Sequence, residues 1–144
     1  MSRSGYTDDC KHLSLYRANV DRTLASKRGQ AFLRELAAAM DAMPDKELIA
    51  QELIDEYGDC CTIGVVCKAR ELDVGKVDPE DSESVAALVG ISRPMAAEIA
   101  YENDECSRLH KDEDGKWRQE TPAERWQRMR QWVEKHLTQP QEQP

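Results

Sequence analysis

Aromatic residues are scarce in this 144-residue chain, which has one Phe, three Trp and four Tyr. Aliphatic side chains and alanine must therefore build most of the core. No apolar run reaches the ~18 residues of a transmembrane helix, and residues 1–13 lack the apolar stretch of a signal peptide. We therefore expect a cytoplasmic protein without a membrane span, whose five cysteines stay reduced.

Motifs for catalysis and cofactor binding are also missing. None of the three histidines has a local signature that ties it to a cysteine nucleophile, so we expect neither an enzyme nor a cofactor. The C-x₂-C spacing typical of zinc sites is absent. One alternative is a zinc site that uses Cys60, Cys67, Cys106 and His110, because the last two lie four residues apart and could share a helical face. Otherwise these cysteines are free thiols.

Negative charge is concentrated in one part of the chain. Residues 71–115 hold thirteen Asp and Glu against four Lys and Arg, a formal charge of −9, while the whole chain carries −8. Such uneven charge costs self-repulsion in the folded state. It disfavours binding to nucleic acids or anionic membranes but permits binding to basic proteins. The plainer alternative is an acidic surface that only keeps the protein from aggregating.

Apolar residues follow helical spacing over most of the chain. We expect an all-α domain of five to seven helices over residues 1–137, with little or no strand, and a disordered polar tail over 138–144. The expected helices cover about residues 9–26, 30–42, 46–57, 61–72, 79–90, 93–104 and 122–137. The expected core residues are Leu33, Leu36, Met40, Ile49, Leu53, Ile99, Trp126, Met129 and Val133.

Capping residues and helix breakers indicate where these helices begin and end. Gly29 should follow the first helix, and Pro44 should stop the second, since the residue before a proline avoids the α conformation. Asp45 should cap the third helix and Asp78 the fifth. The clearest signal is Thr121-Pro122-Ala123-Glu124, in which the threonine caps a helix and the glutamate can reach back to the cap nitrogen.

Residues 61–72 form the ambiguous segment. Ile63, Val65 and Val66 favour a strand by residue type, but the apolar positions follow helical spacing. We favour a short helix, because a lone strand would find no partner elsewhere in this chain.

Residues 84–104 also fit a helix-turn-helix, with Gly90 in the turn and Ser92 opening the second helix. In a DNA-binding protein the second helix would enter the major groove. Four acids and one base would lie exposed on it, namely Arg93, Glu98, Glu102, Asp104 and Glu105. Because phosphate repels such a surface, we prefer a plain α-helical hairpin and keep a DNA-binding regulator as the alternative function.

Five segments carry a resemblance to known proteins. They are MSRSGYTDDC at 1–10, KRGQAFLREL at 27–36, DPEDSESVAALVGI at 78–91, EIAYENDE at 98–105 and ETPAERWQRMRQWVE at 120–134. Together they resemble a family of small proteins encoded in phage genomes and prophage regions. The resemblance implies expression in the cytoplasm of a bacterial host. By analogy, small phage proteins of this size bind a host machine, including nucleic-acid-targeting defences such as CRISPR effectors.

We therefore expect a small acidic viral protein that binds a host protein with a basic surface and inhibits or modulates it. The acids expected to carry this binding are Glu80, Asp81, Glu83, Glu98, Glu102, Asp104 and Glu105. Neither nucleic acid nor membrane is expected as a partner. Trp117 or Trp132 could lie in an interface, where tryptophan is enriched. An exposed tryptophan serves self-association as well as host binding, so the sequence leaves a homodimer open.

Overall fold

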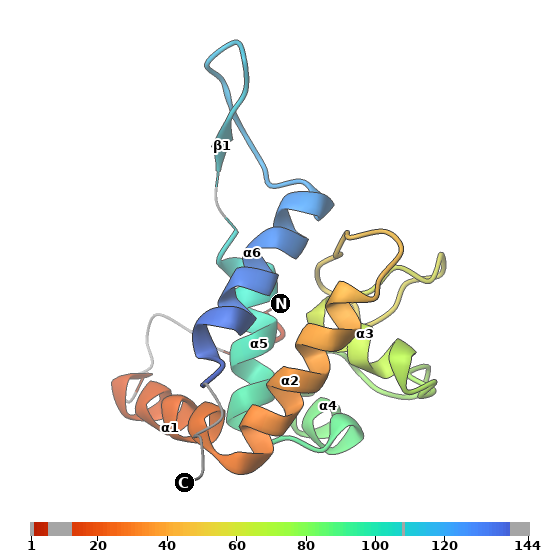
Figure 1. The fold of residues 1–144 in the computed structure, drawn as a ribbon, viewed down its shortest axis with the longest axis vertical. Coiled ribbons are helices and arrows are strands. Elements are labelled where there is room, and N and C mark those ends of the chain that lie inside the picture. Colours follow the sequence, from red (N-terminus) through yellow and green to blue (C-terminus); the bar gives the residue numbers. More distant parts are fainter. Residues whose placement is uncertain (1, 6–12, 108, 139–144) are drawn as a thin grey trace, which may run out of the picture.

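The structure of the protein is a computed structural model (Figure 1), and residues 2–5, 13–107 and 109–138 are described. Six helices are present in the described part: α1 (Leu13–Ala25), α2 (Lys27–Asp41), α3 (Thr62–Ala69), α4 (Ser82–Val89), α5 (Arg93–Glu105) and α6 (Pro122–His136). A short antiparallel hairpin of β1 (His110–Lys111) and β2 (Trp117–Arg118) precedes α6. The prediction of an all-α domain is thereby confirmed. Among the described helices, none has the length and apolar character needed to cross a membrane.

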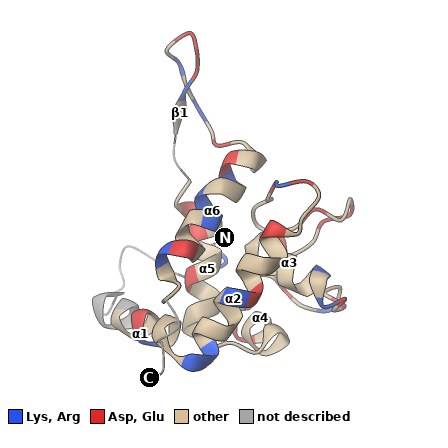
Figure 2. Cartoon of the chain, viewed as in Figure 1, with Lys and Arg blue, Asp and Glu red and all other residues tan. Residues whose placement is uncertain are grey.

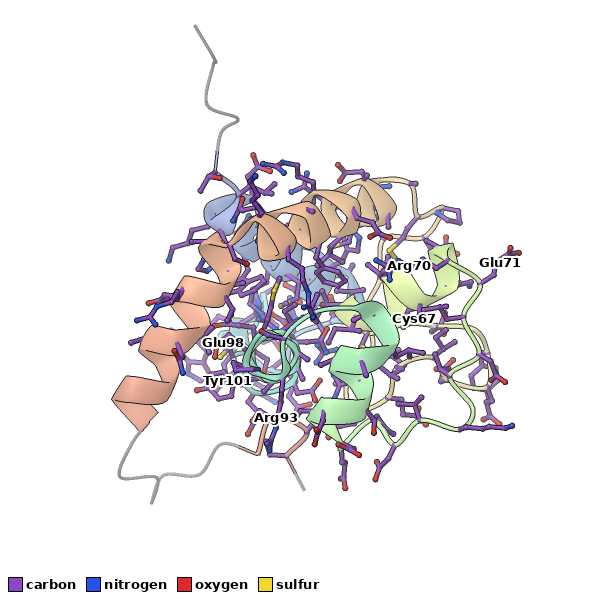
Figure 3. All side chains as sticks on the ribbon, turned by 90° about the horizontal axis from the view of Figure 1, so that it is seen from below. Cys67, Arg70, Glu71, Arg93, Glu98 and Tyr101 are labelled. Atoms are coloured by element: carbon purple, nitrogen blue, oxygen red, sulfur yellow. The ribbon has the colours of Figure 1, made fainter. Side chains whose placement is uncertain are left out.

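Helix α5 lies at the centre of the bundle. It packs against α1, α3, α4 and α6, and Figure 3 shows it nearly end-on with other helices around it. Residues 95–100 are all buried, although an amphipathic surface helix would bury one face and expose the opposite one. Small residues at Ala96, Ala97 and Ala100 let neighbouring elements approach α5 from several sides.

The expected core is largely confirmed. Seven of the expected residues are buried: Leu33, Leu36, Met40, Leu53, Ile99, Met129 and Val133. Ile49 and Trp126 are partly buried and pack against the edge of this core. The short helix predicted near residues 61–72 is also present as α3, and its first six residues are buried.

Two helix boundaries differ from the expectation. Gly29 lies inside α2, whose cap is Ser26, and a Cβ at Gly29 would lie 2.1 Å from the Thr23 carbonyl oxygen. That glycine therefore permits a close approach between α1 and α2. Helix α4 begins at Ser82, because Asp81 caps it, while Asp78 accepts the Glu80 backbone N–H in the preceding turn.

The third expected helix, over residues 46–57, is wrong. This segment is irregular, and its backbone groups form hydrogen bonds with residues outside it. Leu48 N donates to Pro122 O at 3.0 Å, Ile49 N donates to Cys60 O at 2.9 Å, and Cys61 N donates to Leu53 O at 3.1 Å. Leu48 is also fully buried. Pairing with distant residues therefore outweighs the local helical spacing.

Thr138, the first residue of the expected tail, contacts the helical bundle. The backbone N–H of Thr138 donates to Gln30 Oε1 at 2.8 Å. The Gln30 amide also donates to the carbonyl oxygens of Leu24 and His136, so this buried glutamine ties the ends of α1 and α6 to α2. The rest of the expected tail, residues 139–144, and the expected helix start at residues 9–12 lie outside the described residues.

A buried polar junction joins the C-terminal part of α5 to three other segments. Arg3 donates to both oxygens of Asp104, at 2.6 and 2.7 Å, and these side chains are 2% and 1% exposed. Asn103 Oδ1 accepts from the backbone and hydroxyl of Thr62, at 3.1 and 2.7 Å. The Asn103 amide donates to Ile49 O at 3.0 Å. These bonds satisfy polar groups that would otherwise be costly to bury.

We expect the Arg3–Asp104 pair to show strong coupling in unfolding experiments. Arg3→Met or Asp104→Leu alone should lower the free energy of unfolding by about 3–5 kcal/mol, because each leaves one buried charge without its partner. The double variant should lose clearly less than the sum of the two. Urea denaturation of the four proteins measures this, and additive losses would contradict a coupled buried pair.

Candidate protein-binding surface

The seven acids predicted to bind a partner do not share one face. Glu80, Asp81 and Glu83 are exposed at the start of α4. Two acids of α5 were wrongly expected on the surface: Glu98 is 4% exposed, and the Asp104 side chain is held inside by Arg3. The reason is the central position of α5. Neighbouring helices cover it on several sides, although its charged residues had suggested an exposed helix.

The other two acids of α5 lie near its end. Glu105 is exposed and accepts hydrogen bonds from the hydroxyls of Ser2 and Ser4, at 2.8 and 3.0 Å. Glu102 is partly buried and, with Glu98, lines a polar cavity of about 460 Å³ between α1, α5 and α6. Figure 3 shows Glu98 turned toward this interior and not toward the outer surface. Of the four α5 acids expected to bind a partner, Glu105 alone is therefore exposed.

A different set of acids forms a continuous exposed segment, which we call the acidic loop. It comprises residues 71–83, from the end of α3 to the first turn of α4. All six of its acids are exposed: Glu71, Asp73, Asp78, Glu80, Asp81 and Glu83. Lys76 is the sole base in this stretch, so its formal charge is −5. Red segments follow the loop beside α3 and α4 in Figure 2, and Figure 3 shows Glu71 pointing away from the body.

The sequence of the acidic loop explains why its acids face outward. Leu72, Val74 and Val77 are partly buried and pack against the core. The acids stand between and beside these anchors, so packing the apolar side chains directs the carboxylates to solvent. This alternation of acidic and apolar residues was the signal that could have identified Glu71 and Asp73 from the sequence.

Local hydrogen bonds order parts of the acidic loop. Asp73 accepts from Gly75 N at 2.9 Å, Asp78 accepts from Glu80 N at 2.9 Å, and Asp81 accepts from both the backbone and the hydroxyl of Ser84. The Ser84 side-chain and backbone bonds lower the pKa of Asp81 below its ordinary value. Three of the six carboxylates, those of Asp73, Asp78 and Asp81, are thus held by local hydrogen bonds.

Few cations neutralise the acidic loop. Acids elsewhere on the surface pair with arginine, as Glu35 does with Arg70 and Asp41 with Arg130, and these pairs lower the pKa of both carboxyl groups. Within the described part of the chain, five loop acids have no Lys or Arg nitrogen within 4.0 Å: Glu71, Asp73, Asp78, Asp81 and Glu83. The loop thus keeps a local negative potential that can attract a basic surface.

The proposed zinc ligands do not come together. Cys60 and Cys67 are buried, and burial raises the pKa of their thiols to about 11 and about 12. Helix α5 ends at Glu105, so Cys106 and His110 share no helical face. No group of three or more His, Cys, Asp or Glu side chains that could hold a metal ion occurs among the described residues. The described structure therefore does not bring Cys60, Cys67, Cys106 and His110 together as the ligands of one zinc site.

The expected helix-turn-helix exists as a local shape but has no free recognition helix. Gly90 ends α4 in the left-handed conformation (φ +79°), and Ser92 caps α5. However, α5 is the central core helix, and its buried residues 95–100 cannot reach base edges in a major groove. The burial of residues 95–100 weighs against DNA recognition by this helix, and the DNA-binding regulator stays an untested alternative.

The β1–β2 hairpin extends away from the helices in Figure 1. Glu124, in the first turn of α6, anchors both strands: Arg118 donates to it at 2.6 Å, and His110 Nδ1 lies 3.1 Å from its other oxygen. Glu124 also completes the predicted capping box with Thr121. Trp117 is 65% exposed on β2, whereas Trp132 contacts the ring of His136 in a tilted arrangement and belongs to the helical body.

Comparison of this chain with protein-family models, with curated proteins and with solved structures found no match.

Acid should release the hairpin anchor through Glu124. The Arg118 side chain and the Thr121 backbone N–H lower the pKa of Glu124 from 4.5 to about 2. A carboxylate with a lowered folded-state pKa stabilises the fold above pH 4.5 and loses this contribution as the pH falls toward about 2. Thermal unfolding of Glu124→Gln should therefore depend less on pH over this range than that of the wild type. Identical pH profiles would contradict the anchor.

Proposed function

We propose that this protein binds a basic surface of a host protein through the acidic loop and thereby inhibits or modulates that protein. The observation that supports this proposal is the exposed row of acids at residues 71–83, which has a formal charge of −5. We further propose that binding, and not catalysis, is the role of the chain.

Charge complementarity supports a basic protein as the partner. Negative side chains held at fixed positions steer a positively charged surface during encounter and add ion pairs in the complex. Phosphate groups of a nucleic acid or of an anionic membrane would instead be repelled. Proteins that handle nucleic acids expose basic surfaces for their own substrates, so the acidic loop would occupy positions that phosphates take.

The nature of the host partner follows from the resemblance to phage and prophage proteins. Such a protein acts inside a bacterial cell, where nucleic-acid-targeting defence systems, CRISPR effectors among them, present basic channels. We therefore propose a nucleic-acid-handling host protein, with a defence effector as the leading class. The acidic loop would block access of nucleic acid to that channel.

Charge reversal in the acidic loop tests this proposal. In the loop variant, Glu71, Glu80 and Glu83 are each replaced by Lys, while Asp73, Asp78 and Asp81 stay because they hold the loop conformation. Tagged wild type captures its partner from bacterial lysate, the partner is purified, and association rates are measured with both proteins. We expect the association rate of the loop variant to fall by on the order of tenfold or more.

A matched control variant distinguishes an effect of the acidic loop from an effect of the total charge of the protein. In the control variant Glu52, Glu113 and Asp114, which are exposed outside the loop, are each replaced by Lys, with the same change in total charge. The control should keep an association rate near that of the wild type. Equal losses in the two variants, or an unchanged rate in the loop variant, would exclude the acidic loop as the binding surface.

A further inference from the structure

A cavity of about 210 Å³ lies where the junction of α1 and α2 meets the turn between α4 and α5. Ile91 and Met95 give it a buried apolar wall. The rest of its lining is basic or small, and consists of Arg22, Thr23, Ser26, Arg28, Gly29 and Ser92. No Asp or Glu of the described chain lines this cavity. An acidic protein of net charge −8 therefore contains a recess whose only charged lining residues are arginines.

The two arginines of this cavity differ from most other arginines of the protein. Acidic residues outnumber Lys and Arg by 28 to 20, so an arginine readily finds a carboxylate. The described arginines that have a carboxylate oxygen within 4.0 Å are Arg3, Arg70, Arg118, Arg125, Arg128 and Arg130. Among the described residues, neither Arg22 nor Arg28 has such a partner. Their positive charge is therefore not neutralised by an ion pair with the described part of the chain.

A backbone contact positions one of these guanidinium groups. Arg28 Nε donates to Gly90 O at 2.7 Å, which links the first turn of α2 to the end of α4. Its two Nη atoms form no hydrogen bond with a described residue. Guanidinium N–H groups in this fork arrangement bind two oxygens of a phosphate or a carboxylate at once. Arg28 is therefore held at the cavity with donors left for an anion.

Two helices begin at the wall of the cavity. Ser26 caps α2 and Ser92 caps α5, and both residues line the recess. The first turns of α4 and α6 contain an acid, Glu83 and Glu124, whereas the first turns of α2 and α5 contain none and each helix begins with a basic residue. The start of a helix has a partial positive charge that favours an anion. Both helix starts thus add to the positive potential of the arginines.

We propose that this cavity binds the phosphate group of a small phosphorylated molecule. Phosphate has about two negative charges and three acceptor oxygens, which matches two arginines and a free hydroxyl better than a singly charged carboxylate does. The Ser92 hydroxyl accepts from Met95 N at 3.3 Å and keeps its own hydrogen to donate to a phosphate oxygen. The apolar wall of Ile91 and Met95 would contact the organic part of the ligand.

The size and charge of the surroundings favour a small free molecule over a polymer. The cavity is smaller than the pockets of about 300–1,000 Å³ that take drug-sized ligands, so it has room for one phosphorylated group of modest size. Residues 22–34 contain four Lys and Arg and no acid, and Figure 2 shows basic residues in blue where α1 meets α2. The formal charge of −9 on residues 71–115 repels an extended polyanion but leaves this recess positive.

The cavity is separate from the acidic loop. The loop reaches the first turn of α4, and the cavity lies beyond the last turn of this helix. The two surfaces also have opposite charge. This inference therefore does not depend on the proposed host partner, and loss of phosphate binding would leave the proposal for the acidic loop unaffected.

Titration with inorganic phosphate tests the site directly. Isotope-labelled full-length protein is titrated at constant ionic strength, so that screening does not imitate binding, and its amide resonances are followed by NMR. The amides of Gly29, Ile91 and Ser92 should shift in a saturable way, with a dissociation constant of about 1 mM or lower. Adenosine monophosphate should shift the same amides, whereas adenosine, which has no phosphate, should not.

Charge removal at the cavity should weaken this binding. Arg22→Gln with Arg28→Gln should raise the dissociation constant for phosphate by about tenfold or more, because both guanidinium groups are lost. Arg22→Gln alone removes no hydrogen bond or ion pair of the described structure, so it should fold as the wild type and still bind phosphate more weakly. The control Arg34→Gln with Lys116→Gln makes the same change in total charge at exposed residues outside the cavity. It should bind phosphate as the wild type does.

Three results would overturn the proposal. The first is that about 10 mM phosphate, tenfold above the expected dissociation constant, shifts no amide of the cavity. The second is equal weakening in the control and in the cavity variants. The third concerns the source of the phosphate, and uses phosphatidylglycerol vesicles and duplex DNA. If either binds through Arg22 and Arg28 while adenosine monophosphate does not bind, the ligand is a membrane or a nucleic acid and not a small molecule.

Discussion

The polar junction at the end of α5 is the constraint on which the arrangement of the rest depends. Asp104 binds the N-terminal segment through Arg3. Asn103 binds α3 through Thr62 and the irregular segment over 46–57 through Ile49. Arginines of α6 also donate to carbonyl oxygens at this helix end. Buried polar groups tolerate few alternative partners, so this junction selects one packing from the many that an aliphatic core would allow.

This junction also helps to explain which acidic residues are exposed at the surface. Because α5 is enclosed and its end is bonded on several sides, Glu98 and the side chain of Asp104 lie in the interior, and Glu105 alone among the acids of α5 is exposed. A separate group of exposed acids lies on the connection between α3 and α4, where apolar anchors pack against the core and short-range hydrogen bonds order the backbone. The same packing thus buries acids of α5 and leaves the acids of the acidic loop exposed.

Much of the helical architecture could be predicted from the sequence, and the failures have identifiable causes. Caps such as Thr121 and Ser92 act through bonds within a few residues, so their helices were correctly placed. The segment over 46–57 failed because its backbone pairs with Pro122 and Cys60, which local spacing cannot reveal. Glu98 and Asp104 failed because charge on a helix indicates exposure only when that helix lies at the surface.

We propose that the acidic loop attracts a basic partner through its charge. The most direct measurement is the association rate of the wild-type protein with its purified partner as a function of ionic strength. If the claim holds, the rate falls steeply as salt screens the loop, and most of that salt dependence disappears when the loop charges are reversed. A rate that does not change with salt would contradict the claim.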